Sequence, residues 1–204
     1  MKSPTAPIAS VRLAEHLESL RACRRCQKMH TPVVSGEPVV SKIVLVGPAP
    51  SEPEPALGQP FAWAAGQTLF KWLFETSGLT EDRLRSSIYV TAVCRCFPGK
   101  KPGGGDLAPS PEDAANCSVW LKRELTILKP ELVIPVGKLA ISWFLPTDQL
   151  DDVIGNRFRI WDFDVIPLPQ PSAASLWRSL EPGKTLLHRA LTMIASHPAF
   201  LELR

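Results

Sequence analysis

The hydrophobic positions of the chain form short unbroken runs, and these alternate with segments in which apolar residues recur at helical spacing. Unbroken runs rich in β-branched residues are typical of buried strands. Three such runs cover residues 42–47, 87–93 and 131–137. A further stretch, 157–168, predicts a short β pair that turns at Asp162. Helical spacing of apolar residues predicts helices. They cover residues 10–22, 66–78, 110–128 and 183–196.

Local signals mark the ends of two of these helices. Ser110 can cap the third helix, with Pro111 in its first position and Asp113 in its first turn. Gly78 can end the second helix in a left-handed conformation. The residues expected to face the core are Val11, Ala14, Leu17 and Leu20 in the first helix, Leu69, Phe70, Leu73 and Phe74 in the second, and Ala114, Cys117, Leu121, Leu125 and Leu128 in the third.

The alternation of buried strands and helices is typical of a parallel sheet that helices cover on both faces. We therefore expect an α/β fold, a three-layer α/β/α sandwich with a central, mainly parallel sheet of about four strands. The whole chain, residues 1–204, is expected to form one domain. Its length and its 45% content of hydrophobic residues are sufficient for one core.

Loops that leave the carboxyl ends of parallel strands hold the ligand site in such folds. Three loops rich in proline or glycine occupy those places, over residues 47–55, 94–106 and 167–175. In the last loop Pro167, Pro169 and Pro171 lack the amide hydrogen that a central strand needs. We expect a stiff, extended loop at the mouth of a pocket, with the side-chain amide of Gln170 held between two prolines.

The net charge of +3 is too small to establish a polyanionic partner. Basic residues nevertheless gather beside the cysteine pairs, among them Arg24, Arg25, Lys100 and Lys101. They are either phosphate ligands or solvated surface charges, and charge alone does not decide between the two. No apolar run reaches the roughly 18 residues of a membrane span. The N-terminus has no signal-peptide core, and we expect a cytoplasmic protein.

Five cysteines are present: Cys23 and Cys26 in a C-x-x-C, Cys94 and Cys96 in a C-x-C, and Cys117 alone. One C-x-x-C fits zinc, iron–sulfur or redox chemistry equally well. A disulfide framework is not expected without a secretory signal. Four thiolates together would suit tetrahedral zinc or a [4Fe-4S] cluster, and the irregular spacing differs from that of a zinc ribbon. For Cys117 the alternative is a small buried hydrophobic residue on its helix.

Six landmarks occur in order along the chain. They are "CRRC", "LVGPAPSE", "GQPFAWAAGQTL", "YVTAVCRCFPGKKP", "PSPEDAANCSVWLKRELTILKPELVIPVGKLA" and "PLPQPSAASLW". From about Cys23 to Leu191 the chain thereby resembles the iron–sulfur uracil-DNA glycosylases, families 4 and 5 of the uracil-DNA glycosylase superfamily. The resemblance implies a three-layer α/β/α sandwich that flips a damaged base out of DNA and hydrolyses its N-glycosidic bond in base-excision repair. We expect a monomer that acts on DNA containing uracil or another deaminated base.

The resemblance also implies roles for individual residues. A structural [4Fe-4S] cluster is expected on Cys23, Cys26, Cys96 and Cys117, where it ties down the N-terminal segment of about residues 1–41. Cys94 falls on a position that is not a ligand. The base is expected to contact Gly47, Pro48, Ala49, Phe61, Ala92 and Gln170, with Phe61 as the stacking face. DNA is expected to contact Arg95, Lys100, Lys101, Ser172 and Ser175.

Three departures from the family pattern bear on catalysis. Pro48 stands where many relatives carry an acid or an amide, and Ala92 where other families place an asparagine that reads the base. Gln170 replaces the histidine of the His-Pro-Ser motif, although its NH₂ group can still donate to the leaving uracil oxygen. Glu52, with nearby Glu54, is the expected carboxylate for orienting water, unless both are solvated surface charges. The alternatives to an active glycosylase are a catalytically silent DNA-lesion binder and an iron–sulfur scaffold for repair partners.

Overall fold

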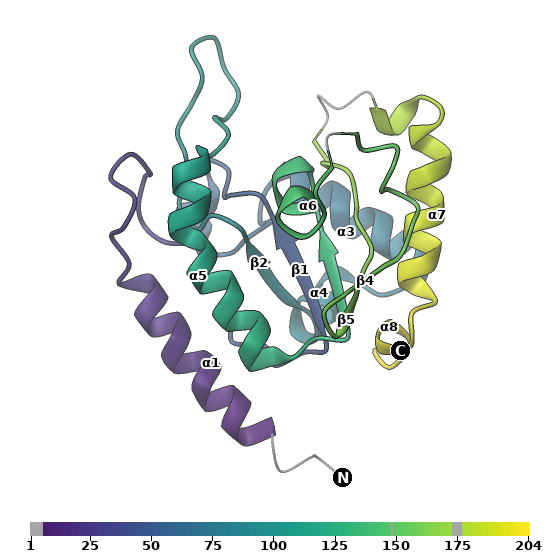
Figure 1. Cartoon of the computed structure of the whole chain (residues 1–204), viewed down its shortest axis with the longest axis horizontal. Coiled ribbons are helices and arrows are strands. Elements are labelled where there is room, and N and C mark those ends of the chain that lie inside the picture. The colour runs from purple at the N-terminus through teal and green to yellow at the C-terminus, as the bar shows by residue number, and fades with distance from the viewer. Residues whose placement is uncertain (1–5, 148, 173–176) are drawn as a thin grey trace.

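A five-stranded sheet runs through the centre of the computed structural model, which describes residues 6–147, 149–172 and 177–204 (Figure 1). The strands are β1 (Ile43–Gly47), β2 (Tyr89–Ala92), β3 (Leu132–Pro135), β4 (Phe158–Ile160) and β5 (Phe163–Val165). Their spatial order is β2-β1-β3-β5-β4; the first four run parallel, and β4 pairs antiparallel with β5. The expected α/β class and mainly parallel sheet are confirmed. The sheet has five strands because both strands of the predicted β pair join it.

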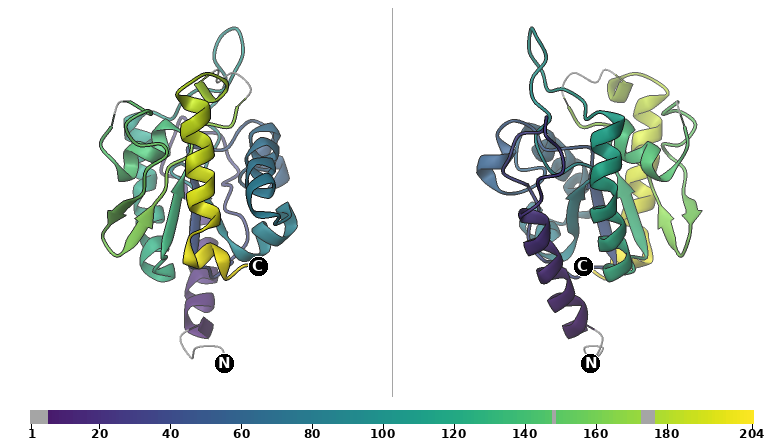
Figure 2. Two further views of the ribbon diagram at one scale, coloured as in Figure 1. Left: turned by 90° about the vertical axis from the view of Figure 1, so that its right-hand side faces the viewer. Right: turned by 60° about the vertical axis from the view of Figure 1, so that its left-hand side comes forward.

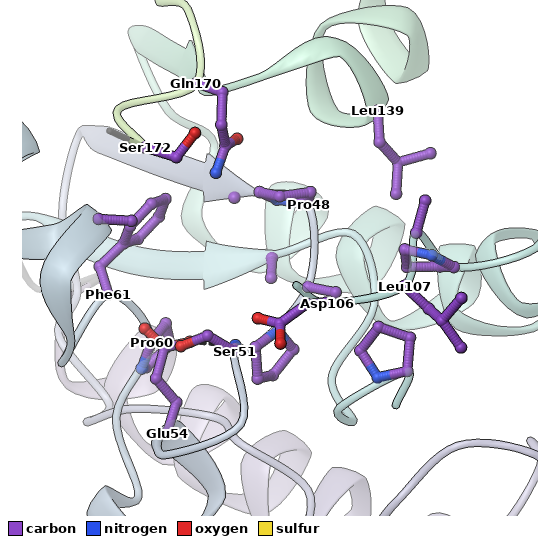
Figure 3. Close-up of a pocket in the computed structure, with 18 of the residues that line it drawn as sticks. Pro48, Ser51, Glu54, Pro60, Phe61, Asp106, Leu107, Leu139, Gln170 and Ser172 are labelled. Atoms are coloured by element: carbon purple, nitrogen blue, oxygen red, sulfur yellow. Dashed lines mark hydrogen bonds between the residues drawn. The ribbon is translucent and has the colours of Figure 1, made fainter. Parts of the chain in front are cut away.

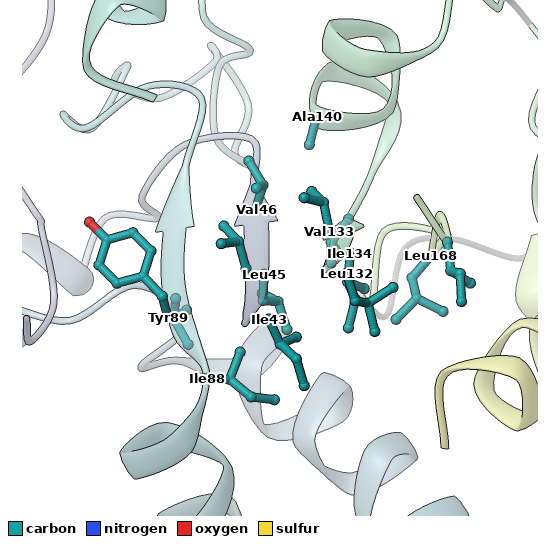
Figure 4. Close-up of a cluster of buried hydrophobic side chains, with 14 of the residues drawn as sticks. Ile43, Leu45, Val46, Ile88, Tyr89, Leu132, Val133, Ile134, Ala140 and Leu168 are labelled. Atoms are coloured by element: carbon teal, nitrogen blue, oxygen red, sulfur yellow. The ribbon is translucent and has the colours of Figure 1, made fainter. Parts of the chain in front are cut away.

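Strand β1 is the middle of the core. All of its residues are buried, and Leu45 is in register with Val90 on one side and Ile134 on the other. Aliphatic side chains of β1 and β3 pack together along the sheet (Figure 4). A strand buried on both faces needs apolar residues at every position, which explains the unbroken run in the sequence.

Helices cover the sheet. They are α1 (Ala6–Arg21), α2 (Glu54–Leu57), α3 (Ala64–Ser77), α4 (Glu81–Ser87), α5 (Pro111–Leu128), α6 (Lys138–Phe144), α7 (Gly183–Ala195) and α8 (Pro198–Leu201), with a 3₁₀ turn over Trp177–Ser179. Helix α1 packs against α5 on one side of the sheet, and α3 packs against α7 on the other (Figure 2). These are the outer layers of the predicted sandwich. None of the helices within the described residues is long and apolar enough to cross a membrane.

The end signals predicted at Ser110 and Gly78 are confirmed, but part of the predicted core face is wrong, and Phe74 is 49% exposed. Ser110 and Asp113 form a capping box, and Gly78 ends α3 with φ of 76°. Helix α1 begins before Ser10, and Val11 is 58% exposed. Its buried face is formed by Leu13, His16, Leu17 and Leu20. Periodicity of apolar residues alone missed this face because one of its members is a histidine.

The proline-rich stretch after β5 is extended, as predicted, but it also continues the sheet for a short distance. Leu168 donates its amide to Pro135 O (2.9 Å) and accepts from Gly137 N (2.9 Å). The amide of Ile166 also donates to β3, at Val133 O (3.1 Å). Even-numbered residues therefore pair with β3, and the prolines occupy the alternate positions, where the ladder requires no donor. The first residues of the expected loop therefore extend the sheet beside β3.

A buried polar network joins β2, the loop after it, α5 and α1. Arg95 Nη2 lies 2.6 Å from Glu124 Oε2, and the two side chains are 1% and 0% exposed. Thr91 Oγ1 donates to the same carboxylate oxygen (3.0 Å), and His16 Nε2 lies 3.4 Å from Oε1. Burial opposes the ionisation of Glu124, but the Arg95 charge and the surrounding hydrogen bonds outweigh it and lower its pKa to about 2. Glu124 is therefore a carboxylate at neutral pH.

We expect Glu124→Gln to lower the free energy of unfolding by about 3–5 kcal/mol, because the Arg95 charge would remain buried without its counterion. Urea denaturation of the purified protein measures the loss. Glu75→Gln is the control, because Glu75 forms an exposed pair with Lys71 (3.8 Å) on the helix surface, where such pairs contribute little. Equal, small losses for the two variants would contradict a structural role for the buried pair.

Candidate active site and cysteine cavity

A pocket of about 520 Å³ opens where the strands end. Its walls come from the loop after β1, the segment from Pro60 to Ala65, the end of β2, the loop from Pro98 to Pro109, the start of α6 and the proline-rich stretch. The carboxyl ends of parallel strands meet at this edge. The three loops predicted to surround a pocket therefore do so, and the start of α6, which follows β3, joins them.

The ring of Phe61 forms one wall of the pocket (Figure 3). The backbone of Phe61 is left-handed, with φ of 55°, a conformation that L-residues rarely adopt. A Cβ at Gly47 would stand 2.8 Å from the Phe61 ring, and one at Gly66 would stand 1.7 Å from the Phe61 carbonyl oxygen. These two glycines leave the space that the ring and the carbonyl occupy. The Phe61 ring can therefore form this wall only while residues 47 and 66 are glycines.

Gln170 enters the pocket from the proline-rich stretch, and Figure 3 shows its amide nitrogen directed toward Pro48. Its Oε1 atom lies 2.2 Å from the point where a Cβ of residue 137 would stand. Gly137 has φ of 81° and precedes α6, so glycine is required there for conformation and for space. The neighbouring prolines restrict the backbone of Gln170. The prolines thus limit the backbone that carries the amide, and Gly137 leaves room for its oxygen.

Two carboxylates, those of Glu54 and Asp106, line the pocket, and they differ in burial and in hydrogen bonding. Glu54 is buried and accepts hydrogen bonds from backbone amides, including Ser51 N (2.9 Å). Burial raises the pKa of Glu54, and those amides oppose the shift only in part. Asp106 is exposed and forms no side-chain hydrogen bond or ion pair with any described residue. Figure 3 shows Asp106 among the residues that line the pocket. Asp106 therefore keeps acceptor oxygens available.

All six expected base contacts line this pocket. They are Gly47, Pro48, Ala49, Phe61, Ala92 and Gln170, together with Lys101 and Ser172 from the expected DNA contacts. Two expectations are wrong. Glu52 does not line the pocket and instead pairs with Lys100 on the surface. Arg95 cannot reach a phosphate, because its guanidinium is buried against Glu124. Ser175 lies outside the described residues.

Sequence reasoning did not identify Asp106 or Trp63 as pocket residues. Asp106 follows three glycines with positive φ, Gly103 to Gly105, in a hairpin where Lys101 N donates to Gly105 O (2.9 Å). A run of glycines predicts a tight turn, but it does not predict the direction of the next side chain. Trp63 caps α3 and is 52% exposed at the pocket. Its place two residues after Phe61, within "GQPFAWAAGQTL", was the available signal.

Four of the five cysteines line a second cavity, of about 250 Å³. Cys23 and Cys26 come from the segment after α1, Cys96 from the loop after β2 and Cys117 from α5. Cys94 is fully buried beside this cavity and does not line it. Backbone hydrogen bonds hold the first two segments together, from His30 N to Phe97 O (2.8 Å) and from Val34 N to Arg95 O (2.7 Å).

The thiols of this cavity influence one another. Burial and the neighbouring thiols raise the pKa of Cys26 to about 12 and that of Cys96 to about 11. In the part of the chain that the structure describes, no three His, Cys, Asp or Glu side chains stand close enough together to hold a single metal ion. The four cysteines instead lie around the cavity. Soft thiolate ligands around a space larger than one ion fit a polynuclear cluster, with positive charge that would favour ionised thiols.

Comparison with known proteins gives a consistent result. The family described as the uracil DNA glycosylase superfamily matches residues 34–201. A type-4 uracil-DNA glycosylase of Thermotoga maritima is 32% identical over 177 residues, which cover 83% of this chain and 86% of that protein. One of Archaeoglobus fulgidus is 32% identical over 152 residues, 72% and 70% of the two chains. A type-5 uracil-DNA glycosylase of Pyrobaculum aerophilum is 29% identical over 143 residues, 63% and 60%.

We expect Gly137→Ala to destabilise the protein by about 1–3 kcal/mol from backbone strain alone, with a further loss from the collision with Gln170. The second part can be measured separately. In a Gln170→Ala background the collision is absent, so urea denaturation should show a smaller cost of Gly137→Ala, with a coupling of at least about 0.5 kcal/mol. Equal costs in the two backgrounds would show that Gly137 does not constrain Gln170.

Proposed function

The chain belongs to the uracil-DNA glycosylase superfamily, and on this premise we propose that it binds a uracil flipped out of DNA and hydrolyses the bond between base and sugar. The convergence of Phe61 and Gln170 on one pocket at the carboxyl edge of the sheet carries this proposal. A flipped base needs an aromatic face for stacking and a donor for its polar edge. The pocket supplies both from rigid segments.

The leaving base defines the role of Gln170. When the bond between the sugar C1′ and uracil N1 breaks, the electron pair goes to the base, which leaves as an anion. A donor aimed at a uracil oxygen stabilises that charge more in the transition state than in the ground state. The Gln170 amide nitrogen is directed into the pocket and can donate there. It carries no charge, so we expect slower chemistry than a protonated imidazole would give.

We assign the attacking water to Asp106. The water oxygen forms the new bond to C1′, and its proton needs an acceptor. Glu54 already accepts from backbone amides, and Glu52 lies outside the pocket in its pair with Lys100. Asp106 is the pocket carboxylate whose oxygens remain available among the described residues. Asp106 thus takes the role expected for Glu52 from the sequence, and no acidic residue is needed at position 48.

The phosphates next to the flipped nucleotide would contact Lys101 and Ser172 at the pocket. Lys100 lies on the same hairpin, and its partner Glu52 is about half exposed, so a phosphate can compete for the lysine. Lys101 and Lys100 thus form the basic part of the proposed DNA contact. Arg95 has no part in it.

For the cysteine cavity we propose a [4Fe-4S] cluster held by Cys23, Cys26, Cys96 and Cys117. Bound there, the cluster would join three segments that are distant in sequence, with no redox step in the reaction. These cysteines would hold the N-terminal segment of about residues 1–41 against the loop that leads to the hairpin, in one domain with the rest of the chain. The four-cysteine lining, with Cys94 apart from it, supports this ligand set.

A catalytically silent binder of DNA lesions is the second candidate function. It is favoured by the neutral Gln170 and by Pro48, which provides neither an acid nor an amide at the pocket. Such a protein would use the same pocket and the same stacking face. The two functions therefore differ in chemistry and not in recognition.

The proposed function predicts excision of uracil from a labelled oligonucleotide, scored as abasic sites in single-turnover reactions. Asp106→Asn should lower the rate by about 10²-fold, the usual contribution of a proton acceptor. Glu52→Gln is the matched control and should react like the unmodified protein, because Glu52 does not line the pocket. A complex with uracil DNA that forms no abasic sites would favour the silent binder, and equal binding of uracil and thymine DNA would contradict both functions.

The proposed cluster predicts a brown protein with about four irons per chain after anaerobic purification. Cys96→Ser should lose the colour and the iron, whereas Cys94→Ser, two residues away, should keep both because Cys94 does not line the cavity. Visible absorption and iron analysis measure the two properties. Stoichiometric zinc without iron would contradict the cluster, and equal iron loss in the two variants would contradict the ligand set.

A further inference from the structure

Phe61 sits in a backbone conformation that the chain must maintain against its own preference. A non-glycine residue at φ of 55° costs free energy, and a bulky aromatic residue there relaxes unless neighbouring contacts prevent it. The segment from Pro60 to Trp63 has no regular secondary structure. Hydrogen bonds from side chains outside the segment must therefore hold it.

Arg85, on α4, provides such contacts from behind the pocket wall. Its Nη2 donates to Phe61 O (2.6 Å) and its Nη1 donates to Pro60 O (3.1 Å). The left-handed turn at Phe61 directs these two successive carbonyls toward the same guanidinium, whose fork of donors suits two acceptors. The Arg85 side chain does not line the pocket and is only 20% exposed. Its contacts with Phe61 therefore have little competition from water.

Two further contacts fix Arg85 itself. Its Nε donates to Glu81 Oε1 (2.8 Å), one turn earlier on α4. Its guanidinium carbon lies 4.4 Å from the centre of the Phe70 ring on α3, in cation–π geometry. The guanidinium is thus fixed between two helices before it meets the Phe61 carbonyl.

Glu54 holds the same segment from the opposite side. Its carboxylate accepts from Ser51 N (2.9 Å), and the nearby amides of Ala62 and Trp63 favour its ionised form. The carbonyls of Pro60 and Phe61 thus bind a cation, and the amides that follow them lie near an anion. A different backbone conformation at Phe61 would break the contacts of this segment with both Arg85 and Glu54.

We propose that Arg85 is a positioning residue for recognition of the flipped base: it holds Phe61 in the left-handed conformation that places the ring against Gly47 as the stacking wall. The proposal rests on the proposed function in that it takes Phe61 as the stacking face. Arg85 itself touches neither base nor DNA. Its effect on recognition must therefore pass through Phe61.

Arg85→Gln tests the proposal, and Arg83→Gln is the matched control. Arg83 lies on the same helix and also donates to a backbone carbonyl, Leu203 O (3.2 and 3.0 Å), at the far end of the chain. Affinity is measured by fluorescence anisotropy for a duplex with one 2′-fluoro-deoxyuridine, which resists excision, and for the matching thymine duplex. Both substitutions are repeated in a Phe61→Ala background.

We expect Arg85→Gln to reduce the preference for the uracil duplex about tenfold, within the range of coupling between contacting residues. Arg83→Gln should leave it unchanged, and Arg85→Gln should have no further effect once Phe61 is alanine. An equal effect of Arg85→Gln in the two backgrounds would overturn the proposal, because Arg85 would then act by another route. So would a preference that stays unchanged in Arg85→Gln.

A measurement without DNA separates this proposal from the proposed function. In protein with ¹³C-labelled phenylalanine rings, the resonance that disappears in Phe61→Ala identifies Phe61. It should shift or broaden in Arg85→Gln and stay in place in Arg83→Gln. An unmoved resonance in Arg85→Gln overturns the positioning role. Equal affinity of the unmodified protein for the two duplexes, combined with a moved resonance, overturns the proposed function and leaves the positioning role intact.

Discussion

The buried ion pair between Arg95 and Glu124 is the interaction on which both sites depend. Arg95 lies between Cys94 and Cys96 at the start of the loop that forms the hairpin of the pocket. Glu124 lies on α5 seven residues after Cys117, about two helical turns along the same face. The pair therefore sets the position of the loop relative to the helix, and with it the separation of two of the proposed cluster ligands. Such a pair is stable only while both partners are present, because either charge alone would be buried without compensation.

Two backbone positions with positive φ support the pocket above the regular strands. Phe61 and Gly137 have positive φ, and each supports one of the two groups proposed to hold the base. Strain of this kind persists only where surrounding contacts over-determine it. Here the contacts come from the parallel strands, from glycines that leave room, and from charged side chains on the flanking helices. The outcome is a pocket whose stacking face and donor are in place before a ligand arrives, which reduces the cost of ordering them on binding.

The fold was predictable from the sequence because its core obeys local periodicity. The run around Leu45 and the capping box at Ser110 each dictate their own structure. The polar groups were less predictable, since their positions depend on contacts distant in sequence. Arg95 looks like a surface residue in a basic loop, and only the fold shows that Glu124 lies opposite it. Asp106 reaches the pocket for the same kind of reason, through a hairpin whose direction its glycines do not specify. The cysteine lining agrees with the predicted ligand set, and family resemblance supplied that prediction where spacing left several chemistries open.

The alternate prolines after β5 also affect how the molecule behaves toward other chains. Beyond Val165 the outer side of this stretch has no strand partner among the described residues, because β4 pairs only with Phe163 to Val165. A bare strand edge normally offers amide donors to which a foreign strand can add, and this is a common start of aggregation. The donors of Ile166 and Leu168 are already used by β3, and the positions that face outward are Pro167 and Pro169, which have none. Over this stretch, beside the pocket, the sheet therefore offers no outward amide donor to a foreign strand.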